Sequence, residues 1–276
     1  MISTASLLGC LFSLAVSLVL PIGFIIYYGF RHRGEGVVSA WILGAMGFVI
    51  PQLLIRLPLL QSLAAMPGFG SFVSDHYLLY ALGLAVTAGL FEFAGRFAVA
   101  KYIEKKGRLG CRVSLAAGLG HGGIEAIILV GMTYINNLVL LFMIQSGGFD
   151  ALIAQTAAVG GDTAALTGAR DLLLATPSLS FFLAGIERLL AMTAHVGMSL
   201  VVCYSVYRQR AWLGFAICVG YHTLIDASCA LASPQLGLSQ GASYAIIYTI
   251  LTAMAVLALF VIRRIRRSWE KEAAHA

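Results

Sequence analysis

Seven long apolar segments constrain this chain more than any other feature of its sequence. A helix needs roughly 20 residues to cross the hydrocarbon core of a bilayer. Backbone groups in lipid must also find their hydrogen bonds within the protein, which favours helices for such segments. The sequence therefore predicts an all-α polytopic membrane protein, a bundle of about seven transmembrane helices forming a single integral membrane domain over residues 1–276. The segments are Thr4 to Phe30, Val37 to Leu60, Tyr77 to Ala100, Val113 to Ile144, Leu179 to Tyr204, Trp212 to Ala232 and Ser243 to Ile262.

Charge is scarce and confined to the connections. Only 11% of the residues are charged, whereas soluble domains have about a quarter. The net charge of +6 would suit nucleic acid, but it lies in short loops beside the apolar segments, as is usual for cytoplasmic loops of membrane proteins. We expect membrane lipid as a partner and no nucleic acid.

The basic residues also predict the orientation. They occur in the connections after the first, third and fifth segments and in the C-terminal tail, whereas the opposite connections hold Arg170 and several aspartates. By the positive-inside rule, the N-terminus is outside and the C-terminus is cytoplasmic. This arrangement suits a multi-pass protein of a plasma (inner) membrane. The basic residues are Arg31, Arg33, Lys101, Lys105, Lys106, Arg108, Arg112, Arg208, Arg210, Arg263, Arg264, Arg266, Arg267 and Lys271.

Two local features modify the helical pattern. Pro51 predicts a kink near the outer end of the second segment, because proline cannot donate a helical hydrogen bond. The connection at 145–177 is unusually long and is predicted to be extracytoplasmic, with a short helix from Thr163 to Ala175.

Four titratable side chains from four different segments fall in one layer of the membrane. Each lies about eight to eleven residues from the predicted cytoplasmic end of its helix, which is ~12–16 Å at 1.5 Å per residue. Ionisable residues in membrane helices are costly and usually mark a site, and unrelated ones would not share a depth. The four are Glu92, His121, His195 and His222.

Further polar residues could support this layer. Residues four apart lie on one face of a helix, so each member of three such pairs can orient or neutralise the other. Glu187 and Arg188 are adjacent, and we expect them chiefly to pair with each other or to cap a polar network. The three pairs are Glu92 with Arg96, His121 with Glu125 and His222 with Asp226.

The chemistry that these residues suit is hydrolysis. Three imidazoles and a carboxylate, His121, His195, His222 and Glu125, can bind a divalent metal such as zinc. Glu92 can then act as the general base on a water molecule. Without a metal, Glu92 could still activate water while the histidines stabilise the oxyanion. The sequence leaves both mechanisms open, with Glu92, His195 and His222 as the catalytic candidates.

Around these residues the chain resembles the YhfC family of bacterial intramembrane metalloproteases, which looks like a branch of the superfamily of CAAX prenyl proteases and bacteriocin-processing enzymes. The most family-specific match is GHGGIEA at 120–126. The superfamily's three motifs resemble FEFAGR at 91–96, ERLLAMTAH at 187–195 and HTLID at 222–226. Phe93 stands at the second glutamate of the first motif, Ala191 at a frequent phenylalanine, and Asp226 at the usual asparagine.

The resemblance implies an intramembrane peptidase with its catalytic helices within 77–232. It implies that Glu92 activates water, that His195 and His222 bind metal or stabilise the oxyanion, and that a peptide or membrane protein is the substrate. His121 and Glu125 belong to the narrower family pattern, and zinc follows from the family label. The loss of the second glutamate argues against a mechanism with two carboxylates.

Two other functional classes fit the same residues. A transporter of protons, metal ions or small solutes also uses buried Glu, His and Asp, although the chain shows no inverted repeat. A non-enzymatic membrane or immunity protein could have retained the fold.

Overall fold

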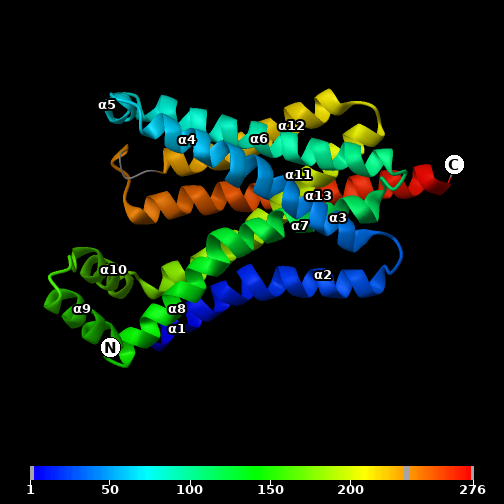
Figure 1. The fold of residues 1–276 in the computed structure, drawn as a ribbon. Helices are drawn as coiled ribbons and strands as arrows, with labels where there is room; N and C mark the ends of the chain where they lie inside the picture. Colours follow the sequence, from blue (N-terminus) through cyan, green and yellow to red (C-terminus); the bar gives the residue numbers. More distant parts are fainter. Residues whose placement is uncertain (1–2, 233–235, 275–276) are drawn as a thin grey trace. The chain divides into compact units, whose positions relative to one another are not determined.

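The computed structural model describes residues 3–232 and 236–274, and within them it forms helices and no strand (Figure 1). In the described part of the chain, seven helical spans are long and apolar enough to cross a membrane, which confirms the predicted fold class. Large apolar side chains such as Leu79, Phe142 and Trp212 are exposed on them, as lipid-facing residues are. The spans are Thr4–Arg31, Val37–Ala64, Tyr77–Lys105, Cys111–Gln145, Ser178–Tyr207, Ala211–Leu231 and Gln240–Glu272.

The last helix is longer than predicted. The seventh apolar segment ends at Ile262, but α13 (Gln240–Ala274) continues through the basic tail. This tail lacks Gly and Pro, and Arg266 donates to Glu270 one turn later, at 2.8 Å. Such an i,i+4 ion pair stabilises an exposed helix, so the charged tail remains helical.

The described chain divides into two compact units, and the first contains residues 1–22 and 126–189. Its core is made by Cys10, Tyr134, Leu141, Leu173 and Phe181. The hydroxyls of Ser13 and Tyr134 both donate to the carbonyl of Phe181. The helices of this unit are α1 (Thr4–Leu14), η1 (Ala15–Val19), η3 (Ala126–Gly131), α8 (Met132–Gln145), α9 (Gly148–Ala158), α10 (Ala164–Ala175) and the first part of α11 (Ser178–Tyr207).

The long connection at 145–177 contains two helices where the sequence predicts one. α10 lies within the range of the predicted helix, whereas α9 was not predicted. Arg170 joins them by donating to Asp150 at 2.9 Å and to Asp171 at 3.0 Å. These hydrogen bonds, that to Asp171 first, raise the pKa of Arg170.

The second unit contains residues 23–125 and 190–276. One apolar cluster joins α6, α11, α12 and α13 around Leu200 and Cys218, and another joins α3, α6 and α7 around Val37 and Ala116. The helices are most of α2 (Leu20–Arg31), α3 (Val37–Phe48), η2 (Val49–Arg56), α4 (Leu57–Ala64), α5 (Phe69–Asp75), α6 (Tyr77–Lys105), α7 (Cys111–Glu125), the rest of α11, α12 (Ala211–Leu231) and α13.

Glycines let α3 approach its two neighbours at backbone distance. A Cβ added to Gly44 would overlap the carbonyl of Ala117 on α7, and one added to Gly120 would overlap the carbonyl of Trp41. On the other side of α3, a Cβ on Gly95 of α6 would overlap the carbonyl of Gly47. Small residues drive close helix packing in membranes, where burial in lipid supplies little force.

The predicted irregularity at Pro51 is a π-helical turn. η2 carries Pro51 in its first half and continues into α4. Pro51 cannot donate a backbone hydrogen bond, and wider π turns often occur at functional sites.

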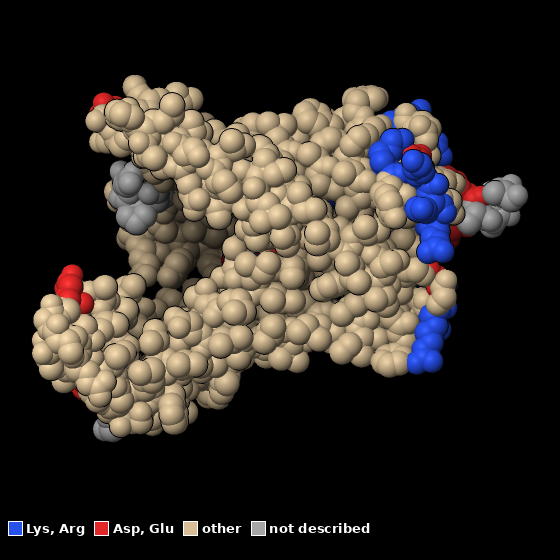
Figure 2. Space-filling view, in the orientation of Figure 1, with Lys and Arg blue, Asp and Glu red and all other residues tan. Residues whose placement is uncertain are grey.

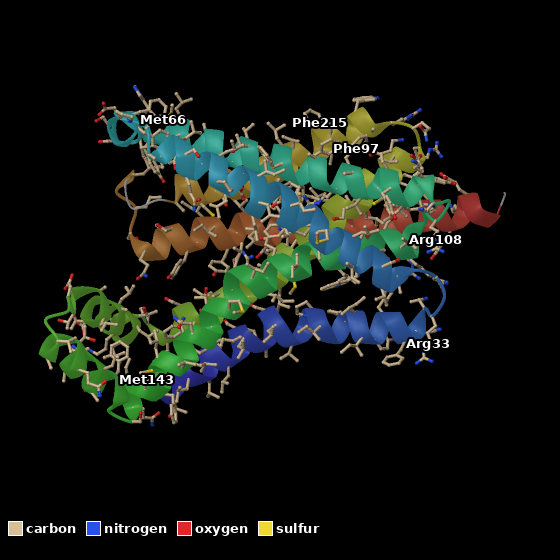
Figure 3. All side chains as sticks on the ribbon, in the orientation of Figure 1. Arg33, Met66, Phe97, Arg108, Met143 and Phe215 are labelled. Atoms are coloured by element: carbon tan, nitrogen blue, oxygen red, sulfur yellow. The ribbon has the colours of Figure 1, made fainter. Side chains whose placement is uncertain are left out.

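The surface Lys and Arg side chains of the second unit gather at one end of its helices (Figure 2), where Figure 3 labels Arg33 and Arg108. At this end Arg112 donates to Glu35 at 2.8 Å, tying the start of α7 to the α2–α3 turn. The hydrogen bonds from Arg112 and, second, from His32 lower the pKa of Glu35. The clustering agrees with the positive-inside pattern, and the orientation across the membrane stays a prediction.

Candidate functional site

Glu92 on α6 is the centre of a buried polar cluster in the second unit. Its Oε2 atom lies 2.7 Å from Nη1 of Arg96 and 3.3 Å from Nε2 of His121. The same oxygen lies 3.5 Å from Nδ1 of His195 and 3.4 Å from Nδ1 of His222. All five residues are at most 6% exposed. The structure therefore brings together the four residues of the predicted layer, from α6, α7, α11 and α12.

Arg96 fixes the orientation of two neighbours at once. Its Nη2 atom lies 2.7 Å from Nδ1 of His195, and its Nε atom donates to Ser199 at 3.2 Å. Arginine can only donate, so Nδ1 of His195 accepts and the neutral ring carries its proton on Nε2. That nitrogen lies 2.9 Å from Oε2 of Glu125. Glu125, predicted as a ligand or a supporting residue, thus contacts His195 from the side opposite Arg96.

His222 is placed by its own i,i+4 partner. Its Nε2 atom lies 3.3 Å from Oδ2 of Asp226, whose side chain is 36% exposed. The carboxylate favours a proton on Nε2, which leaves a lone pair on Nδ1 of the neutral ring. Among the residues that the structure describes, this buried Nδ1 atom has no hydrogen-bond partner.

The imidazoles are also held by packing. The ring of His121 stacks on that of His195 at 5.5 Å between centroids and meets Phe48 edge-on at 5.4 Å. A Cβ on Gly122 would lie 2.8 Å from the Cβ of His195. Gly122 therefore lets α11 approach α7 closely enough for the two rings to meet.

Phe93, which stands where the superfamily resemblance predicts a glutamate, packs among aromatic rings. Its ring stacks on Phe97 at 5.6 Å and meets Phe215 of α12 edge-on at 5.1 Å. Figure 3 labels Phe97 and Phe215 on α6 and α12. The position thus serves apolar packing between these two helices.

Sequence reasoning missed Gln52 and misjudged Arg56. Gln52 is 6% exposed and donates from Nε2 to Oε1 of Glu92 at 3.1 Å. Arg56 lies near the end of an apolar segment, where an arginine can extend towards the membrane surface, yet its Nη1 atom donates to Gln52 at 3.3 Å and its Nη2 atom to the carbonyl of Leu84 at 2.7 Å. The available signal was a glutamine and an arginine one turn apart beside Pro51 in an apolar segment.

Glu187 and Arg188 lie in the first unit and pair with each other, as the sequence favoured. Nε of Arg188 donates to Oε2 of Glu187 at 2.6 Å, and Nη2 donates to Oε1. A supporting role for them in catalysis stays a prediction.

The donor atoms of the cluster fit a divalent metal. Glu92, His195 and His222 each offer one ligand atom, and these atoms lie within 4.8 Å of one another. Zinc bonds of ~2.0–2.1 Å in a tetrahedron place ligand atoms about 3.3–3.4 Å apart, close to the 3.4 and 3.5 Å from Glu92 to the two imidazoles. The unbonded Nδ1 of His222 is a suitable ligand. Arg96 uses the lone pair of His195 Nδ1, so binding there requires the guanidinium to withdraw.

Comparisons with known proteins identify the family of the chain. A family model described as "YhfC intramembrane metalloprotease" matches residues 16–251. The chain is similar to the "Uncharacterized membrane protein YhfC" of Bacillus subtilis (strain 168), with 29% identity over 267 residues, which are 96% of this chain and 99% of that protein. No solved structure matches. The chain belongs to the YhfC intramembrane metalloprotease family.

Proposed function

We propose that this multi-pass membrane protein is an intramembrane peptidase that hydrolyses a peptide bond with water activated by Glu92. The observation that supports the proposal most is a single buried carboxylate oxygen within 3.5 Å of three imidazoles from three other helices. A peptide or membrane-protein substrate follows from the family name. Hydrolysis needs both a proton acceptor and groups that stabilise an oxyanion, and the cluster holds both kinds.

The proposed reaction has two proton transfers. Oε2 of Glu92 accepts a proton from water while the hydroxide oxygen adds to the scissile carbonyl carbon. N–H groups of the histidines stabilise the resulting oxyanion, with His222 donating from Nδ1 when its ring is protonated and paired with Asp226. Glu92 then returns the proton to the leaving amine as the carbon–nitrogen bond breaks.

We also propose that Glu92, His195 and His222 can hold a divalent metal, with zinc as the candidate and His121 and Glu125 as further possible ligands. The chemistry that such an ion supplies is polarisation of the carbonyl and a lower pKa of bound water. Glu92 belongs to both the ligand set and the proton-transfer scheme, so metal content bears directly on its role.

The proposed setting is the bacterial plasma membrane, with the basic end of the second unit in the cytoplasm and the 145–177 connection outside. Counting along the helices then puts the cluster in the cytoplasmic half of the bilayer. The gathering of basic side chains at one end of this unit (Figure 2) supports this orientation through the positive-inside rule.

Terminal labelling of proteins in bacterial membranes tests the activity. Membranes containing the wild-type chain should yield new N-termini that are absent with Glu92→Gln and with His222→Ala. Loss of a general base lowers rates by about 10²–10⁴-fold. Glu104→Gln, on the same helix as Glu92 but paired with Lys101 outside the cluster, is the matched control and should resemble wild type. Equal cleavage by the wild type, Glu92→Gln and His222→Ala would refute the mechanism, and solute uptake into sealed vesicles that depends on His121 and His195 would indicate a transporter.

Metal analysis of the purified protein tests the cofactor. If the three donors hold an ion, wild type should contain about one metal per chain. His195→Ala and His222→Ala should lose it, whereas His76→Ala, outside the cluster, should retain it. If the wild-type protein is purified in the presence of zinc and still contains no metal, the result would instead favour hydrolysis by Glu92 without a metal.

A further inference from the structure

We propose that Gln52 and Arg56 form an arm that positions the Glu92 carboxylate, so that Oε1 is fixed and Oε2 is the oxygen that exchanges protons. This inference rests on the proposed peptidase function. Neither residue belongs to the motifs that carry the family resemblance. Both lie on η2, at 52 and 56, one turn apart.

Close packing brings the arm to α6. A Cβ on Gly95 would lie 2.8 Å from Cγ of Pro51, so this stretch of η2 contacts α6 where α6 has no side chain in the way. Gln52, the next residue, reaches α6 with both amide protons. Its Nε2 atom donates to the carbonyl of Ala88 at 3.2 Å and to Oε1 of Glu92 at 3.1 Å.

Arg56 and the Ala88 carbonyl together determine which way the Gln52 amide faces, and Arg56 holds its oxygen. A glutamine amide can usually be turned over without a visible difference. Here Nη1 of Arg56 lies 3.3 Å from Oε1 of Gln52, and because arginine only donates, the amide oxygen must face Arg56. Arg56 is itself held by the Leu84 carbonyl at 2.7 Å and by the Thr87 hydroxyl at 3.3 Å. The NH₂ group of Gln52 therefore has one orientation, towards Glu92.

The consequence concerns the two oxygens of Glu92. Oε1 accepts the hydrogen bond from Gln52, while Oε2 accepts from Arg96 and faces the three imidazoles. A carboxylate held at both oxygens cannot rotate, so the atom that meets water is the same in each turnover. Gln52 and Arg56 touch neither water nor substrate in this scheme. They are positioning residues that act through Glu92.

The first experiment needs no substrate. In full-length protein labelled with ¹⁵N-glutamine, the Gln52 side-chain amide signals are identified by their loss in Gln52→Met. They should shift in Glu92→Gln and stay in place in Glu187→Gln. Signals that do not respond to Glu92→Gln would overturn the proposed hydrogen bond. If the wild type cleaves nothing, the peptidase proposal fails. The NMR measurement still decides whether Gln52 holds the Glu92 carboxylate.

The second experiment measures kinetics on a substrate found by terminal labelling. Gln52→Met should lower kcat by about tenfold or more, with KM within about threefold, because a hydrogen bond to a charged group is lost at the proton acceptor. Gln61→Met, on the same span but exposed, should behave as wild type. A folded Gln52→Met enzyme with wild-type kcat would overturn the positioning role.

Arg56 provides a check should Gln52→Met fail to fold. Arg56→Gln leaves Gln52 in place and removes the donor that orients it, so kcat should fall by a smaller factor. Arg56→Lys keeps a cationic donor and should restore kcat. Equal kcat in wild type and Arg56→Gln would show that Arg56 does not act through Gln52.

Discussion

Two of the glutamate–arginine pairs in the described part of the chain lie within apolar stretches of the spans, and they differ in what the carboxylate can still do. Arg188 donates from Nε and Nη2 to both oxygens of its neighbour Glu187. Arg96, four residues after Glu92, donates to a single oxygen. The i,i+4 spacing leaves the rest of the Glu92 carboxylate to Gln52 and the histidines. Spacing along the helix thus separates a carboxylate whose two oxygens both accept from one adjacent arginine from a carboxylate that organises a site.

Burial accentuates this difference. The side chains of Glu92 and Arg96 are 3% and 2% exposed, whereas those of Glu187 and Arg188 are 27% and 12% exposed. A buried ion pair contributes little net stability, yet removing one partner leaves an uncompensated charge. The interior pair should therefore be the more sensitive to loss of its arginine.

Removing the arginine from each pair tests this comparison most strongly. Arg96→Met should lower the free energy of unfolding by about 3–5 kcal/mol. Arg188→Met should cost roughly 1 kcal/mol, because its pair is partly exposed. Denaturant unfolding in detergent micelles measures both. The double variant Glu92→Gln with Arg96→Met should recover much of the loss, and equal costs for the two arginine variants would contradict the role assigned to burial.

A smaller effect is expected from disturbing the helix packing around the interior pair. Gly122→Ala puts a Cβ 2.8 Å from the Cβ of His195, so the backbone must shift. This shift should lower the free energy of unfolding by about 1–3 kcal/mol, and it moves His195 away from Arg96. Gly220→Ala on α12 is the control, since its Cβ would meet nothing within 4 Å. Unfolding and metal content measure the two effects. A Gly122→Ala protein as stable as Gly220→Ala would contradict the close packing.

The smallest effect is expected at the Glu35–Arg112 pair, whose side chains are 37% and 60% exposed. Its hydrogen bonds lower the pKa of Glu35, so any stability it adds is present above the unfolded-state pKa and lost as the pH falls through the folded-state pKa. Solvent screens such a pair. Glu35→Gln should leave the Tm at pH 7 unchanged, and a large drop would show that the α2–α3 turn matters more than its exposure suggests.

The sequence by itself determined the helical fold and much of the cluster. Hydrophobic length predicts the seven spans, because the thickness of a bilayer allows few alternatives. Counting depth along four spans selects Glu92, His121, His195 and His222 before any contact is known, because a regular helix converts residue number into height.

Only the tertiary structure decided how these residues face each other. Height along a helix says nothing of which neighbour lies alongside, so the contact of Gln52 with Glu92 depends on the π-helical turn at Pro51 and on the absence of side chains at Gly95 and Gly47. The same holds for Arg56, which donates inward because Leu84 and Gln52 offer acceptors there. Local spacing sets the depth of a side chain, whereas the packing of separate helices, governed here by glycines, sets its partners.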